Sequence, residues 1–132
     1  RMVYRTSPFQ LNYYSYHFWI KKPEKLIRDF IYNFFLKSQR FSKVITNYSE
    51  GEPDWLLKSK VKIIEEYDQP EFWTARLKME IELKDFKSGE TRLVHGFDKQ
   101  RRLSYKSVER VPVALSGILQ KELEKLLNKM NL

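Results

Sequence analysis

A long alternation of apolar and polar residues constrains the fold of this chain more than any other feature. From Trp73 to Lys84 every odd position is apolar and every even position is polar or charged. Successive side chains of a β-strand point to opposite faces of a sheet, so this segment is predicted to be a strand with one buried and one solvated face. Lysines at 58, 60 and 62 alternate in the same way with apolar residues and predict a partner strand: Trp55, Leu57, Val61 and Ile63.

The residues between these two segments are typical of a turn. Asp68–Glu71 contains Asp and Pro, which favour tight turns. A hairpin that pairs Tyr67 with Trp73 gathers apolar residues on one face and opposite charges on the other, and this agreement specifies the register. The predicted pairs are Val61 with Met79 and Ile63 with Leu77 on the buried face, and Lys60 with Glu80 and Lys58 with Glu82 on the solvated face.

A second hairpin is predicted at residues 85–90. Its loop Lys87–Gly89 fits a type I turn followed by a bulge, with Gly89 in the left-handed conformation that glycine adopts at no steric cost. The apolar face then continues into a third strand over about Glu90–Arg101. The predicted pairs are Leu83 with Leu93, Ile81 with His95, and Met79 with Phe97.

Two segments have apolar residues at helical spacing. The first helix is expected to begin at Pro23 and to end near Ser38–Arg40, and proline is well suited to a first helical turn. The second is expected over about Pro112–Met130, where Gly117 costs about 1 kcal/mol relative to Ala. The apolar faces consist of Leu26, Ile27, Phe30, Ile31, Phe34 and Phe35 in the first helix, and Leu115, Ile118, Leu119, Leu123, Leu126, Leu127 and Met130 in the second.

Short strands are expected at Phe9–Tyr16 and Lys43–Thr46. A sheet with one wet face and two one-sided helices is most economically arranged with both helices on the buried face. The predicted fold class is therefore α+β: a two-layer sandwich of a mainly antiparallel sheet with two helices packed on one face, in the order β-α-β-β-β-β-α. The length of 132 residues suits a single domain over residues 1–132, with its core at about 9–130.

Residues that perform chemistry are scarce. The absence of cysteine excludes disulfides, thiolate zinc sites and thiol catalysis. The two histidines are far apart in sequence and have no carboxylates at metal-site spacing; His95 falls on the apolar face of a strand, which favours a structural role, and His17 favours packing or a surface position. We therefore expect no enzyme, no metal and no cofactor. The apolar runs are also shorter than the ~20 residues that span a membrane.

The chain is basic, with 25 Lys and Arg against 17 Asp and Glu and a net charge of +8. Basic sheets with exposed aromatic residues bind single-stranded nucleic acid. Here the outward sheet positions are expected to hold Thr, Lys, Arg and Glu, with Ile64 and Phe86 as the only large apolar residues. This favours a solvated lysine-rich face over a nucleic-acid site, with an anionic lipid or nucleic-acid partner as the alternative. The densest basic stretch is Lys99, Arg101, Arg102, Lys106 and Arg110.

The aromatic residues Phe18 and Trp19 directly precede the first helix. They can hold the N-terminal strand against this helix, or they can contact a partner or lipid, because exposed aromatic clusters mark interfaces. The candidate contact residues are Phe18, Trp19, Lys99, Arg101, Arg102 and Lys106.

Two segments are similar to a known family. Residues 11–27, LNYYSYHFWIKKPEKLI, combine a tyrosine-rich strand, a Trp shortly before a Pro, and the start of an amphipathic helix. Residues 83–90, LKDFKSGE, form a strand with an Asp-x-x-Ser-Gly-Glu turn; Phe97 and a closing helix rich in Leu, Glu and Lys follow. Over about residues 8–130 the chain resembles the ABC-type transport auxiliary lipoprotein component family, which is paraquat-inducible lipoprotein-like.

This resemblance implies a non-enzymatic periplasmic lipoprotein of Gram-negative bacteria, anchored to the outer membrane by an acylated cysteine upstream of Arg1. It would work through protein contacts beside an ABC transporter and mammalian-cell-entry (MCE) domain proteins that move lipids between the two membranes. Assembly into a homo-oligomer stays open. Two alternatives are a basic nucleic-acid-binding module and a lipid-carrying periplasmic protein. A carrier needs a cavity between helices and sheet, which Phe30, Phe34 and Trp73 are expected to fill.

Overall fold

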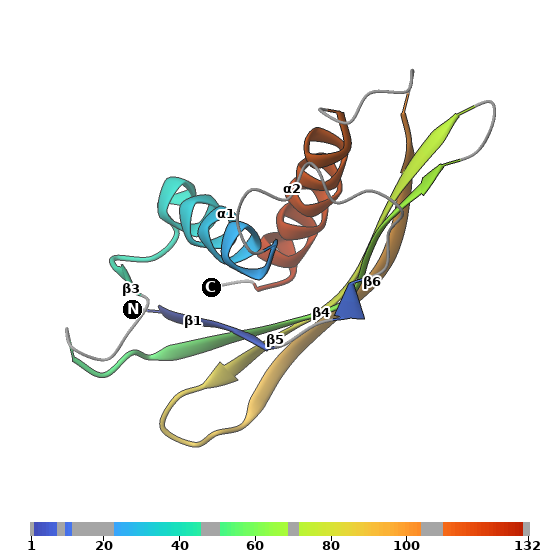
Figure 1. The fold of residues 1–132 in the computed structure, drawn as a ribbon. Helices are drawn as coiled ribbons and strands as arrows, with labels where there is room; N and C mark the ends of the chain where they lie inside the picture. Colours follow the sequence, from blue (N-terminus) through green and yellow to red (C-terminus); the bar gives the residue numbers. More distant parts are fainter. Residues whose placement is uncertain are drawn as a thin grey trace.

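The computed structural model describes residues 2–7, 10–11, 23–45, 51–68, 72–103 and 110–130 of the chain. Figure 1 shows the elements that these residues form. In chain order they are β1 (Met2–Ser7), β2 (Gln10–Leu11), α1 (Pro23–Ser38), β3 (Val44–Ile45), β4 (Trp55–Asp68), β5 (Trp73–Asp85), β6 (Thr91–Arg102) and α2 (Arg110–Met130).

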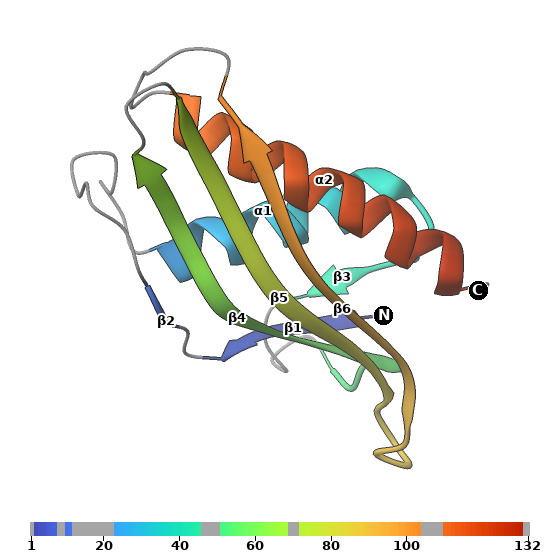
Figure 2. The ribbon, with the colours of Figure 1, turned by 90° about the vertical axis from the view of Figure 1, so that its right-hand side faces the viewer.

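The strands form one sheet with the order β3-β1-β4-β5-β6, and β2 also pairs with β4. The three long strands β4, β5 and β6 are antiparallel, whereas β1 and β2 run parallel to β4. These long strands bend, and both helices lie on the concave side of the sheet (Figures 1 and 2). The predicted α+β class, with two helices on one face of a mainly antiparallel sheet, is confirmed.

The core lies between the helices and this concave face. From the sheet, Leu77, Met79 and Ile81 are at most 1% exposed. They meet Ile31 and Phe35 of α1, and Leu123 and Leu126 of α2, which are equally buried. Each of these residues lies on the face that the spacing of apolar residues predicted. Four predicted helix-face residues are less buried than expected: Leu26 is 41% exposed, and Phe30, Phe34 and Leu127 are only partly buried against the core.

The predicted β4–β5 register is correct in one half of the hairpin and wrong in the other. Val61 pairs with Met79 and Lys60 with Glu80, as expected. A β-bulge between Val61 and Ile63 then adds one residue to β4, and a one-residue shift exchanges the two faces of a strand. Consequently Ile64, not Ile63, pairs with Leu77 and is buried in the core, and Tyr67 pairs with Thr74 rather than Trp73.

The β5–β6 hairpin is confirmed pair by pair. Leu83 lies opposite Leu93, Ile81 opposite His95, and Met79 opposite Phe97. Gly89 has a φ of +72°. The Asp85 carboxylate accepts a hydrogen bond from the Ser88 backbone N–H at 2.9 Å, and this bond, against a smaller cost of desolvation, lowers the pKa of Asp85 below its ordinary value.

The short strands and the end of α1 differ less from the predicted bounds. The strand expected at 9–16 has only Gln10–Leu11 among the described residues, and β1 was not predicted. The strand expected at 43–46 is present as Val44–Ile45. Helix α1 ends at Ser38, and Gln39 has the left-handed φ of 58° that is common after helix C-termini.

Candidate functional site

Among the described residues, no cluster of three or more His, Cys, Asp or Glu side chains could hold a metal ion. None of the described helices is long and apolar enough to cross a membrane. The candidate features of the described residues are buried polar groups and clusters of charge.

His95 belongs to a polar network between β6 and α2. Its ring is 5% exposed, with Nδ1 2.9 Å from Lys129 Nζ and Nε2 2.9 Å from Glu122 Oε1. An ammonium group can only donate, so Lys129 donates to Nδ1, and Nε2 then carries the proton and donates to Glu122. The prediction that His95 is structural rather than a ligand is consistent with this geometry.

Glu122 is the buried carboxylate of this network and is 3% exposed. Burial opposes its ionisation most strongly, but hydrogen bonds from Lys125 Nζ (3.0 Å) and His95 outweigh this effect. The pKa of Glu122 is therefore lower than its ordinary value. The network joins the sheet to α2 through an ionised, paired carboxylate.

The structure separates the basic residues that the sequence grouped together. Lys99 pairs with Leu77 and Arg101 with Ala75, so both are on the helix-facing side of β6. Arg102 pairs with Thr74 and is on the other face. The remaining candidates, Phe18, Trp19 and Lys106, lie outside the described residues, and so does His17.

Lys99 and Arg101 meet two lysines of α2 along an open groove, which we call the basic groove. It has a volume of about 320 Å³ and lies between the C-terminal part of β6 and one side of α2. Lys121 and Lys125 of α2 line it together with Glu122, and Ile118 adds an apolar side chain. Sequence reasoning identified the strand half of this groove and missed the helix half, although Lys121 and Lys125 are four residues apart and therefore share a helix face.

Gly117 explains how Arg101 reaches α2. A Cβ atom at Gly117 would lie 1.9 Å from Nη1 of Arg101, so the guanidinium occupies space that only glycine leaves open. From the sequence, Gly117 was expected only to destabilise the helix. In the structure it permits a close contact between Arg101 of β6 and the backbone of α2.

Arg102 is held on the opposite face of the sheet. Its guanidinium carbon lies 3.5 Å from the centre of the Phe72 ring, which is a cation–π contact. The ring of Phe72 is therefore covered by Arg102 on this side and does not present that face for stacking on a nucleic-acid base.

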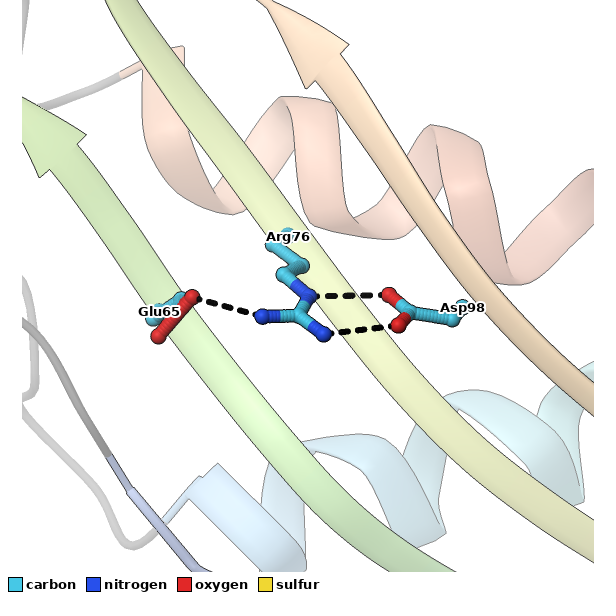
Figure 3. Close-up of polar contacts among 3 residues, drawn as sticks. All are labelled: Glu65, Arg76 and Asp98. Carbon is cyan, nitrogen blue, oxygen red and sulfur yellow. Dashed lines mark hydrogen bonds and ion pairs between the residues drawn. The ribbon is translucent and has the colours of Figure 1, made fainter.

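An ion cluster of Glu65, Arg76 and Asp98 also occupies this outer face, away from the helices (Figure 3). Arg76 donates to both carboxylate oxygens of Asp98, from Nε at 2.8 Å and from Nη2 at 2.7 Å. Its Nη1 donates to Glu65 Oε1 at 3.2 Å. The hydrogen bonds from Arg76 lower the pKa of Asp98 below its ordinary value, against the cost of its partial burial.

The burial of Glu65 was missed by sequence reasoning. Glu65 is 3% exposed although it lies on the outer face, and the bulge in β4 brings it opposite Arg76. The available signal was the doublet Ile63-Ile64, which breaks the alternation of β4. The same doublet explains why the prediction that Ile64 points outward is wrong. Ile64 faces the core, and Ile63 pairs with Lys78 instead.

Besides the basic groove, the described residues form two further hollows on the helical side of the sheet. An apolar one of about 80 Å³ is lined by residues of both helices and by Ile64 and Leu77. This is the volume of a few water molecules, at ~30 Å³ each, and is too small for a lipid chain. A wider, open groove of about 450 Å³ runs between α1 and α2, with Phe30, Phe34 and Leu127 beside Lys37 and Glu124.

No protein-family model and no curated protein matches the sequence. In structure, the chain is similar to a Xanthomonas campestris protein of the DUF330 family, at a TM-score of 0.78 and 14% identity over 96% of this chain and 80% of that one. It is also similar to PelC of Paraburkholderia phytofirmans, solved as a dodecamer, at a TM-score of 0.62 and 12% identity over 92% and 85% of the chains. A lipoprotein from Neisseria meningitidis, GNA1162, gives a TM-score of 0.52 and 8% identity over 94% of this chain and 99% of that one. The chain thus has an α+β fold that is also found in bacterial proteins, lipoproteins among them.

Proposed function

We propose that this chain, as one domain over residues 1–132, is the folded part of a non-enzymatic lipoprotein in the envelope of a Gram-negative bacterium. In this proposal it is an auxiliary component of an ABC/MCE-type lipid transport system that links the inner and outer membranes. It acts through protein contacts, and its anchor is an acylated cysteine upstream of Arg1. The observation behind the proposal is the fold similarity to the DUF330 protein over 96% of the chain.

The arrangement of side chains supports a binding role over a chemical one. Three polar groups buried in the described part of the chain, His95, Glu122 and Glu65, are hydrogen-bonded to each other or to basic side chains. Groups that are paired in this way stabilise a scaffold and offer no free nucleophile or base. The accessible features are surfaces: the outer face of the sheet and the basic groove.

The two alternatives from the sequence are less well supported. A lipid carrier needs an apolar cavity between the layers, and the hollow found there measures about 80 Å³. Phe30, Phe34 and Trp73 are partly buried and pack against the core. A nucleic-acid-binding sheet needs accessible aromatic residues, and Phe72 is covered by Arg102.

Assembly into a homo-oligomer is part of the proposal. PelC, which shares the fold, was solved as a dodecamer. Among the described strands, β6 forms one edge of the sheet, and an edge strand presents hydrogen-bonding groups to a partner. Light scattering coupled to size-exclusion chromatography measures the mass directly, and a monomer at all concentrations would contradict this part.

The experiment for the function is affinity purification of the full-length protein from its own cell envelope after cross-linking. We expect recovery of an MCE-domain protein or of ABC transporter subunits, and incorporation of labelled fatty acid into the protein. Recovery of neither class of partner from envelope that contains the protein would contradict the proposed role. Loss of label when the upstream cysteine is replaced by serine is the matched control for the anchor.

A further inference from the structure

The basic groove brings cations from two distant parts of the chain into one place. Lys99 and Arg101 come from β6, and Lys121 and Lys125 come from α2. The volume of about 320 Å³ falls at the small end of ligand sites, which measure roughly 300–1,000 Å³. Folding therefore places at least three like charges around a space that is large enough for a small polar group.

The charges in the groove are only partly compensated. Glu122 is the acidic residue among its lining side chains, and it already accepts hydrogen bonds from Lys125 and His95. No carboxylate of the described residues forms an ion pair with Lys99, Arg101 or Lys121. Uncompensated charges of one sign around a groove attract ions of the other sign.

Arg101 is the least exposed of these four cations. Its guanidinium lies against the backbone of α2 at Gly117, where a Cβ would be 1.9 Å from Nη1. A side chain that is already held in place loses less conformational entropy when it binds. The planar guanidinium also matches the oxygens of a phosphate group with two parallel hydrogen bonds.

We propose that the basic groove binds the phosphate group of a small ligand, with Arg101 as the central contact and Lys99 and Lys121 beside it. The lining is polar apart from Ile118, so the groove fits a headgroup rather than an acyl chain. The phosphate has two sources, an anionic phospholipid or a soluble phosphate ester. The choice of the lipid as the first source to test rests on the proposed function, which places the chain next to membranes.

The test uses the purified protein and vesicles of phosphatidylcholine with or without phosphatidylglycerol. We expect binding to the anionic vesicles, weakened about five-fold by Lys121→Gln or Lys99→Gln, which corresponds to about 1 kcal/mol for each basic residue at an anionic surface. The matched control is Lys87→Gln, which removes the same charge at the exposed β5–β6 turn. If Lys87→Gln and Lys121→Gln weaken vesicle binding equally, the protein is attracted by its net charge alone, and the proposal is overturned.

A second variant separates binding from folding. Gly117→Ala displaces the guanidinium of Arg101, which can move because it is the end of a flexible side chain. Alanine also favours the helix, so the melting temperature should not fall. We expect Gly117→Ala to weaken vesicle binding as much as Arg101→Gln does. Unchanged binding in both variants would exclude Arg101 as the central contact and contradict the proposal.

Two further arms identify the source of the phosphate. Glycerol 3-phosphate is titrated into the protein while backbone amide NMR signals are recorded, and shifts confined to β6 and α2 that Lys121→Gln abolishes support a soluble ester. The last arm uses a labelled oligonucleotide. If it binds more tightly than the anionic vesicles and glycerol 3-phosphate, and Lys121→Gln weakens this binding too, the proposal is overturned in favour of nucleic acid. These measurements need no partner protein, so they can fail while transporter subunits are still recovered from the envelope, and the reverse also holds.

Discussion

Two carboxylates in this molecule are equally buried, at 3% exposure each, and they are held in different ways. Glu65 lies on the outer face of the sheet and accepts from Arg76, which also holds Asp98 in a two-pronged contact. Glu122 lies between β6 and α2 and accepts from His95 and Lys125. One carboxylate depends on a permanently charged guanidinium, and the other on a histidine and a lysine.

This difference affects what each cluster can do. The Glu65 cluster contains two acids and one base, and it forms a rigid set of cross-strand contacts (Figure 3). The Glu122 cluster contains one acid and borders the basic groove, where positive charge is in excess. We infer that the first serves mainly the stability of the sheet, whereas the second also positions residues for binding.

The largest effect is expected from Arg76→Met. It leaves Glu65 buried without the guanidinium, and breaking a buried ion pair costs about 3 kcal/mol of the free energy of unfolding. Urea denaturation measures this loss, with Lys78→Met at the next outward position of β5 as the control. Adding Glu65→Leu to Arg76→Met should recover part of the loss, and a purely additive double variant would show that the two residues are not coupled.

His95→Leu is expected to cost somewhat less, about 2 kcal/mol, because Glu122 keeps the bond from Lys125 but loses one donor in a buried position. His95→Gln keeps a donor and should recover part of the stability. The control is Gln120→Ala on the exposed side of α2, with an expected change within about 0.5 kcal/mol. A loss in His95→Leu no larger than in Gln120→Ala would show that the network contributes nothing to stability.

The two clusters also show how far sequence reasoning could go. Alternation over Trp73–Lys84 has a single physical explanation, so it predicted β5, its buried face and its pairing with β6. The bulge in β4 could not be located in this way, because both Ile63 and Ile64 are suitable for the core and only the three-dimensional packing selects Ile64. The position of Glu65 opposite Arg76 follows from that bulge and was therefore missed.

The position of Glu122 could have been inferred. It lies four residues after Ile118 and directly before Leu123, within the apolar stripe of α2, and a charged residue in such a stripe needs a partner across the interface. His95 on the apolar face of β6 is the matching polar residue. The basic groove has no such signal, because it depends on how α2 is placed beside β6 and on the space at Gly117.

The pH dependence of stability compares the two clusters directly. The pKa values of Glu122 and Asp98 are lowered by folding, so each carboxylate stabilises the protein above its unfolded pKa and loses this effect as the pH falls through the folded value. Stability should thus decrease below about pH 4.5, the ordinary pKa value for Glu122.

Glu122→Gln should flatten this decrease at low and high salt alike, since the group is buried. Asp98→Asn should flatten it mainly at low salt, since 39% of the Asp98 side chain is exposed. If salt changes the effects of Glu122→Gln and Asp98→Asn equally, the proposed difference between the buried and the partly exposed carboxylate is contradicted.

The smallest expected effect has the opposite sign and tests whether the excess charge beside Glu122 serves binding. Lys121→Glu places an acid near Lys99 and Arg101 and four residues before Lys125, a favourable helix pair. It should raise the free energy of unfolding by about 0.3 kcal/mol and abolish binding to anionic vesicles. A chain that gains stability but loses binding shows that the lysine is retained at a cost to stability, as is common for functional residues. A loss of stability would instead show that Lys121 supports the packing of α2, and the two clusters would then have the same structural role.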